Sequence, residues 1–240
     1  MMDFGAFTFD LPFLSRLASI VLIDLVLAGD NAVVIAMAVR ALPKDLRRKG
    51  ILFGAGAAVL LRVMATFFVA QLLVMRYVKL TGGLVILWIA VKLFLEDEES
   101  VEGKGEAVTV WHAVRLIVIA DISMSLDNML AVGAASNGNF FLLFFGLALS
   151  IPFLVLASGV LEMLMERYPF IIYLGAAVLG RTGGEMIMTD PVVAGFLHPS
   201  RGLVYAVETV CALGVIVAGR LVLRRVLGRS VRPEKADNGQ

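Results

Sequence analysis

Cysteine and histidine are rare in this chain of 240 residues. Because Cys211 is the single cysteine, no disulfide can form within the chain and no multi-cysteine metal cage can be built. The two histidines, His112 and His198, lie near the ends of apolar segments. A zinc or copper centre, which would use imidazole and thiolate ligands, is therefore not expected.

Charged residues are also few, at 17% of the chain, whereas 60% of the residues are hydrophobic. The mean hydropathy of +0.91 is far above that of a water-soluble domain. No nucleotide-binding motif is present, and no basic residue precedes the first apolar segment, so neither an ATPase nor a removable signal peptide is expected. The composition predicts a polytopic protein of the lipid bilayer with one transmembrane domain over 1–240. We expect no enzymatic activity, no permanently bound cofactor and no nucleic-acid or nucleotide partner, and the sequence leaves a homo-oligomer open.

Seven apolar segments have the length of about 20 residues that a membrane-spanning helix requires. They cover 14–39, 51–75, 77–95, 110–135, 139–164, 168–188 and 202–226. Basic residues gather after the first segment and in the tail 227–240, and the positive-inside rule places both groups in the cytoplasm. The sequence therefore predicts an all-α protein of the cytoplasmic membrane with seven transmembrane helices, its N-terminus outside and its C-terminus inside.

One motif occurs twice, 97 residues apart: D-L-V-L-A-G-D-N over 24–31 and D-I-S-M-S-L-D-N over 121–128. Each copy begins a unit of three predicted helices, 14–95 and 110–188. Because three is odd, the second unit enters the membrane in the opposite sense to the first. This pattern predicts an inverted repeat of 3+3 helices, with the substrate site where the repeats meet and 202–226 as an additional helix.

The two copies place four aspartates deep in apolar segments: Asp24, Asp30, Asp121 and Asp127. A central aspartate costs about 2.5–3.5 kcal/mol on insertion scales, and Arg62 is the only clearly central basic residue. One guanidinium cannot neutralise four carboxylates, so a bound cation is predicted. The alternative is that the aspartates pair with basic residues (Arg62, Arg181 or Lys92) and hold the helices together.

Helix geometry limits which side chains of one motif copy could bind the same ion. Asp24 and Asn31 lie within about 20° of one helix face, whereas Asp30 lies about 120° away. Gly29 offers a place for the first helix to unwind, and the second copy has Leu126 there, so we expect a clearer break in the first copy. Alternatively, Asp24 and Asp121 form a gate or support the ligands while Asp30 and Asp127 bind the metal.

The central polar groups offer oxygen, which suits Mg, Ca and Mn. Besides the carboxylates these groups are the amides of Asn31 and Asn128 and the hydroxyls of Ser123 and Ser125. A thioether from Met124 would favour Mn over Ca, although the plainer interpretation is that Met124 and Met129 fill space. Further accessory residues are Arg62, as a partner of one aspartate or as a positive charge that helps an ion leave, Ser125, and the pair Arg181 and Glu185, as an internal ion pair or a gate.

Both motifs, D24-L-V-L-A-G-D30-N31 and D121-I-S-M-S-L-D127-N128, resemble those of the TerC family of integral membrane proteins, in particular its short bacterial YjbE/YkoY branch. The resemblance extends from about 14 to 226. It implies an inner-membrane manganese exporter within a superfamily of LysE-like exporters. By position it implies that the metal is handled by Asp24, Asp30, Asn31, Asp121, Asp127 and Asn128.

The leading hypothesis is export of Mn²⁺, with protons as the exchange partner. A non-transporting assembly partner in metal or tellurium resistance is one alternative. An intramembrane aspartyl protease is another, because Leu27 to Asp30 partly matches G-x-G-D, but the first glycine of that motif is missing. Amino-acid export, by analogy with the superfamily, fits four carboxylates less well than a cation does.

Overall fold

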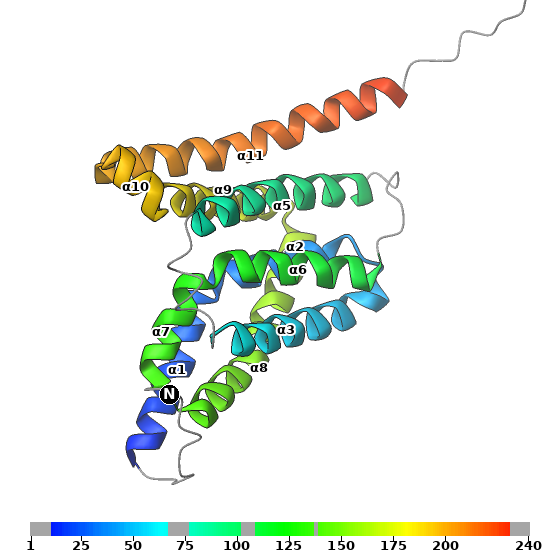
Figure 1. The fold of residues 1–240 in the computed structure, drawn as a ribbon. Helices are drawn as coiled ribbons and strands as arrows, with labels where there is room; N and C mark the ends of the chain where they lie inside the picture. The colour runs from blue at the N-terminus through cyan, green and yellow to red at the C-terminus, as the bar shows by residue number, and fades with distance from the viewer. Residues whose placement is uncertain (1–10, 67–76, 102–108, 137–138, 231–240) are drawn as a thin grey trace, which may run out of the picture.

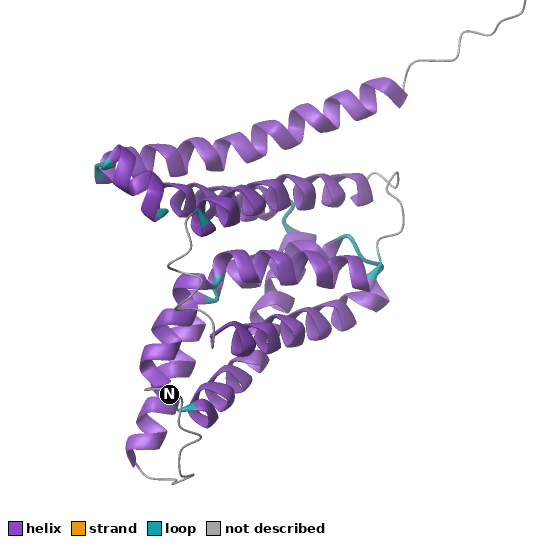
Figure 2. Cartoon of the chain, viewed as in Figure 1, coloured by secondary structure: helices purple, strands orange, loops and turns teal. Residues whose placement is uncertain are grey.

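The computed structural model describes residues 11–66, 77–101, 109–136 and 139–230. All regular secondary structure in these ranges is helical, apart from an isolated bridge residue at Asn139 (Figure 2). The helices are α1 (Leu11–Leu27), α2 (Gly29–Arg40), α3 (Lys44–Thr66), α5 (Val78–Val101), α6 (Val110–Met124), α7 (Leu126–Ser136), α8 (Phe140–Arg167), α9 (Phe170–Thr189), α10 (Pro191–Leu197) and α11 (Arg201–Ser230).

Five of the described helices are long and apolar enough to cross a membrane, namely α3, α5, α8, α9 and α11. Helices α1 and α2 together form a sixth candidate, bent by 56°. The all-helical prediction is therefore confirmed for the described residues, and the count of seven is not. The predicted helix 110–135 is divided into α6 and α7, with 15 and 11 residues, and each is shorter than a membrane crossing requires.

Both copies of the motif are broken at the same position. Ala28 has φ −87° and ψ 2°, and Ser125, 97 residues later, has φ −88° and ψ 0°. These values leave the α-helical region near ψ −42° and turn the chain between two helices. The backbone angles at Ala28 and Ser125 are nearly the same in the two copies, and the turn falls on the residue before Gly29 and before Leu126.

The two broken segments lie side by side. Helix α1 packs beside α7, and α2 packs beside α6, so the two breaks lie close together (Figure 1). Helix α3 packs on α6, and α8 packs on α1 and α2. The repeat itself stays a prediction, as do the unit boundaries at 14–95, 110–188 and 202–226.

Helices α5, α9 and α11 form a second group, seen at the top of Figure 1. Glycines allow these helices to approach closely. A Cβ atom on Gly83 of α5 would lie 2.6 Å from the Gly183 carbonyl oxygen of α9, and one on Gly180 would lie 2.7 Å from the Ala212 Cα of α11. Such contacts between small residues are typical of helix packing in membranes, where apolar burial provides little drive for association.

The packed interior surrounds α2. Between Ala32 and Val39 every side chain except Val33 is at most 3% exposed. Helix α11, by contrast, exposes large apolar side chains such as Tyr205, Val210 and Leu213, as a helix in contact with lipid would. The enclosed α2 and the break at its start together position the site described next.

Candidate cation site at the helix breaks

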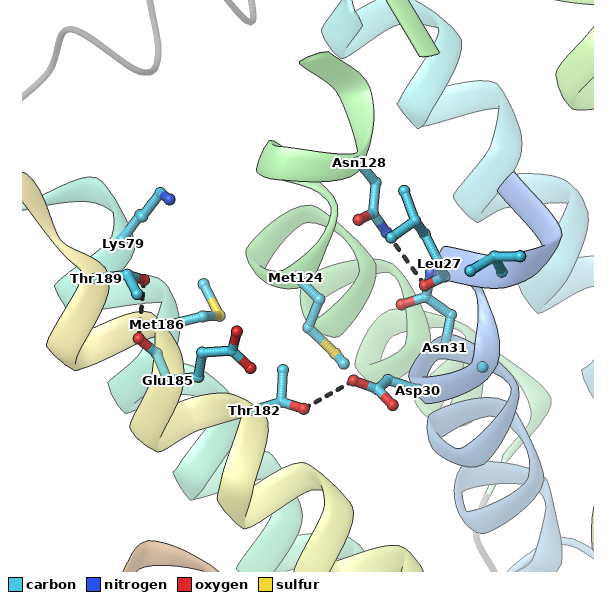
Figure 3. A pocket seen from close by; sticks show the side chains of 12 residues that line it. Leu27, Asp30, Asn31, Lys79, Met124, Asn128, Thr182, Glu185, Met186 and Thr189 are labelled. Atoms are coloured by element: carbon cyan, nitrogen blue, oxygen red, sulfur yellow. Dashed lines mark hydrogen bonds between the residues drawn. The ribbon is translucent and has the colours of Figure 1, made fainter. Parts of the chain in front are cut away.

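A pocket of about 350 Å³ lies where the two broken helices face α9 (Figure 3). It is lined from the first break by Val26, Leu27, Gly29, Asp30 and Asn31, from the second by Met124 and Asn128, from α9 by Thr182, Glu185, Met186 and Thr189, and from α5 by Lys79. The pocket therefore brings together parts of both motif copies, as the repeat predicted, and adds a wall that the motif does not contain.

Asp30 provides a carboxylate at the pocket. It lies in the first turn of α2, where the positive end of the helix dipole stabilises a negative charge by about 0.3–1 kcal/mol. The Thr182 hydroxyl donates a hydrogen bond of 2.8 Å to Asp30 Oδ2. Asp30 is half-buried, so its carboxylate is oriented by α9 while remaining accessible from the pocket.

The two asparagines of the motifs are also at the pocket. The Asn128 amide nitrogen donates a hydrogen bond of 3.3 Å to the carbonyl oxygen of Leu27, which the break in the first copy leaves free. Asn31 is 4% exposed, and its amide nitrogen has no hydrogen-bond partner. Figure 3 shows the Asn31 oxygen on the pocket side. The unpaired group is an N–H donor, which binds acceptors and not cations, so the amide oxygen is the atom of Asn31 that can serve as a metal ligand.

The wall formed by α9 lies on one helix face. Thr182, Glu185, Met186 and Thr189 follow the spacing i, i+3, i+4 and i+7, which brings side chains to the same side of a helix. Glu185 lies 3.8 Å from Arg181, the predicted pair, and Arg181 also donates to Glu208 at 3.1 Å. Sequence reasoning missed Thr182, Met186 and Thr189, although polar residues at this spacing in an apolar helix were the available signal.

Asp24 and Asp121 lie away from the pocket lining. Both are buried and bind the same guanidinium: Arg62 Nη1 donates to Asp24, and Arg62 Nη2 donates to Asp121. We call these three residues the aspartate–arginine triad. It connects α1, α3 and α6. Arg62 thus has two aspartate partners where one was predicted, and the triad retains one net negative charge if both carboxylates are ionised.

The remaining predicted residues are placed as follows. Asp127 lies in the first turn of α7, the position that Asp30 has in α2, but its side chain is outside the described part of the structure. Ser125 is fully buried, and its hydroxyl has no hydrogen-bond partner. The described residues contain no cluster of three or more His, Cys, Asp or Glu side chains that could hold a metal. A metal-binding role for the six motif residues stays a prediction.

Asp190 fixes the end of the pocket that is farthest from α2. This buried residue caps α10 by accepting hydrogen bonds from the backbone of Val192 and Val193. Its other oxygen accepts a 3.0 Å bond from the Leu80 backbone nitrogen at the start of α5. The start of α5, with Lys79, is thereby held beside the end of α9, with Thr189.

Residues 9–227 match the family model described as the integral membrane protein TerC family. The chain belongs to this family. The uncharacterized membrane protein YjbE of Bacillus subtilis (strain 168) is 36% identical over 214 residues, which cover 89% of this chain and 97% of YjbE. The inner membrane protein YgdQ of Escherichia coli (strain K12) is 24% identical and covers 79% of this chain and 85% of YgdQ. No solved structure matches the chain significantly.

Membership in the TerC family agrees with the candidate spans and with the hydropathy. The match includes every helix that lines the pocket, from α1 and α2 to α9. This chain is therefore an integral multi-pass protein of the lipid bilayer, with relatives described as inner membrane proteins.

Proposed function

We propose that this TerC family protein exports a divalent metal cation, with Mn²⁺ as its cargo, across the cytoplasmic membrane through the pocket at the helix breaks. The observation that supports the proposal most strongly is the meeting of Asp30, Asn31 and Asn128, from both motif copies, in one pocket. Broken helices at membrane depth are characteristic of ion and substrate sites in transporters, where freed carbonyl groups and helix ends face the cargo.

The donors at the pocket suit a hard or borderline divalent cation. Asp30 and Glu185 supply carboxylates, Asn31 and Asn128 supply amides, and Thr182 supplies a hydroxyl. Oxygen ligands of this kind bind Mg, Ca and Mn. Asp30 and Glu185 supply two negative charges for such an ion, and these are partly offset by Lys79 at the pocket and by Arg181, which lies 3.8 Å from Glu185. The two carboxylates do not form a closed cage, and a transported ion must be released as well as bound.

Proton exchange would solve an electrical problem. In a cell whose interior is negative, moving two positive charges outward costs about 4.6 kcal/mol per 100 mV, which is twice the cost for one charge. Exchange of one Mn²⁺ for two protons moves no net charge and removes this cost. Protons are therefore the exchange partner that we propose for Mn²⁺.

The other hypotheses gain no comparable support. An aspartyl protease needs two carboxylates that face each other and share a proton. Asp24 and Asp121 instead have the Arg62 guanidinium between them. A non-transporting assembly partner would not require a polar pocket at the helix breaks.

Transport by the purified protein in liposomes tests the proposal. Mn²⁺ movement is followed with a dye inside the liposomes, with and without a pH gradient. We expect Asp30→Asn to reduce Mn²⁺ transport at least about tenfold, since it removes one of the two pocket carboxylates. Asp45→Asn is the matched control, because Asp45 is an exposed aspartate in the first turn of α3. Wild-type protein that moves no Mn²⁺ under either condition would refute export.

A further inference from the structure

Two methionines line the pocket beside the oxygen donors, and they come from different helices. We propose that the thioethers of Met124 and Met186 select the cargo, favouring Mn²⁺ and softer divalent ions over Mg²⁺ and Ca²⁺. This inference rests on the proposed function and concerns the same pocket. It assigns the discrimination between metals to sulfur, whereas the motif carboxylates and amides provide the general affinity for a cation.

Met124 is the last residue of α6, directly before the break at Ser125. It is half-buried and lines the pocket. In Figure 3 its side chain extends toward Asp30, and Glu185 and Thr182 face it from the opposite wall. A cation bound to Asp30 would therefore lie on the side of the pocket to which Met124 extends.

Met129 provides the contrast within the same motif copy. It is 1% exposed and is not part of the pocket lining. The space-filling interpretation thus fits Met129, and Met124 has a surface that a ligand can reach. The sequence alone did not separate these two methionines, because Met124 lies within the motif and Met129 directly follows it.

Met186 is nearly buried beside Gly82 of α5. It lies on α9 and is 9% exposed at the pocket. A Cβ atom on Gly82 would lie 2.7 Å from Met186 Cε and 3.3 Å from the Ser123 carbonyl oxygen, so the glycine allows Met186 to pack closely against α5. A flexible side chain confined in this way presents its sulfur with a smaller loss of entropy on binding.

The chemistry of the ions explains the selection. Ca²⁺ takes six to eight oxygen ligands, and Mg²⁺ keeps several of its waters, so neither ion gains from a thioether. Mn²⁺ and softer ions such as Cd²⁺ accept sulfur ligands more readily. Each methionine also occupies wall area from which an oxygen donor or a water could otherwise serve Ca²⁺. The two methionines therefore favour Mn²⁺ and softer ions, and they provide poorer coordination for Mg²⁺ and Ca²⁺.

Competition in liposomes tests this assignment. Mn²⁺ transport is measured with added Ca²⁺, Mg²⁺ or Cd²⁺ for the wild type, Met124→Leu, Met186→Leu and the double variant. Leucine preserves volume, so folding should be retained, and a thermal unfolding curve for each variant checks it. We expect inhibition by Ca²⁺ to strengthen about fivefold or more in the double variant, and inhibition by Cd²⁺ to weaken by a similar factor.

Met129→Leu is the matched control. It should leave the inhibition of Mn²⁺ transport by Ca²⁺ and by Cd²⁺ unchanged. Unchanged inhibition by both ions in a folded, transporting double variant would overturn the role of the thioethers while leaving export intact. Equal changes in Met129→Leu would overturn it as well, because Met129 does not reach the pocket. Failure of export itself has a different signature, since the wild type would then move no divalent cation at all.

Discussion

A single buried guanidinium binds two buried carboxylates in this protein. Arg62 is fully buried between Asp24 and Asp121, which are 1% and 3% exposed. Removing one partner of a buried ion pair is far more destabilising than replacing the whole pair by neutral groups, because the remaining charge stays buried. The triad therefore fixes α1, α3 and α6 relative to each other beside the pocket.

We expect Arg62→Met to destabilise the protein by about 3–5 kcal/mol, because two buried carboxylates lose their cation. Thermal unfolding of the protein in detergent, monitored by size-exclusion chromatography, measures this loss of stability. The triple variant Arg62→Met, Asp24→Asn, Asp121→Asn should recover much of the stability. Arg48→Met, at an exposed arginine, is the control. Wild-type stability in Arg62→Met would show that the triad is not a stabilising contact.

Thr182 has a different kind of influence, since it orients a pocket carboxylate. A hydrogen bond to a charged group contributes about 1.5–3 kcal/mol, so Thr182→Val should weaken the apparent Mn²⁺ affinity about tenfold or more. The concentration dependence of Mn²⁺ transport measures this change. Thr209→Val is the control, because its exposed hydroxyl bonds only to the Tyr205 carbonyl of its own helix. Unaltered affinity in Thr182→Val would mean that Asp30 is positioned without this bond.

The motif residues could be recognised from sequence, whereas their partners could not. Four aspartates in apolar segments indicated a polar site, because such residues are costly in lipid. The division of the aspartates, with Asp30 at the pocket and Asp24 in the triad, depends on where α3 and α9 pack. Arg62 and Thr182 lie far from the motifs in the chain, so no local pattern links them to Asp24 and Asp30.

At the scale of whole helices, the position of the breaks could also be predicted only in part from the sequence. Gly29 was expected to cause the break, yet the copy with Leu126 at that position is broken at the equivalent residue. The turns at Ala28 and Ser125 use a conformation open to any amino acid. Tertiary packing of α1 on α7 and of α2 on α6 therefore accompanies the break, and local glycine chemistry does not determine it.

Gly29→Ala should consequently be tolerated. A Cβ atom at Gly29 meets no atom within 4 Å, and Gly29 has no positive φ. Replacing a glycine in a compatible conformation stabilises a protein by about 0.4–1 kcal/mol through the unfolded state. Unfolding temperature and Mn²⁺ transport test this, with Gly83→Ala as the contrasting variant, since its Cβ atom would meet the Gly183 carbonyl oxygen. Loss of transport in a folded Gly29→Ala protein would instead assign the glycine a role in movement of the break.

Ion pairs connect two helices at a distance from the pocket lining. Arg47 contacts both Glu162 and Glu166, Lys44 contacts Glu166, and the Arg40 guanidinium donates to the Met165 carbonyl. These contacts connect the end of α2 and the start of α3 with the end of α8. The pocket lining, by contrast, includes Lys79 near the start of α5 and Thr189 at the end of α9.

The predicted orientation assigns the start of α3 and the end of α9 to opposite sides of the membrane. In a Cys211→Ala background, Thr189→Cys should react with a membrane-impermeant maleimide on intact cells, and Lys44→Cys should react only after permeabilisation. Both side chains are exposed in the structure, so access from the solvent decides the result. The cysteine-free Cys211→Ala protein is the control for background labelling. The opposite pattern would invert the topology.

The way in which Arg62 is shared also constrains how the chain can be assembled in the bilayer. Separate fragments divided within 102–108 would leave Arg62 with Asp24 in one piece and Asp121 without a cation in the other. The second piece would then insert with a buried charge that only the first piece can neutralise. In the intact chain, pairing of Asp121 therefore depends on contact between α6 and the earlier helix α3.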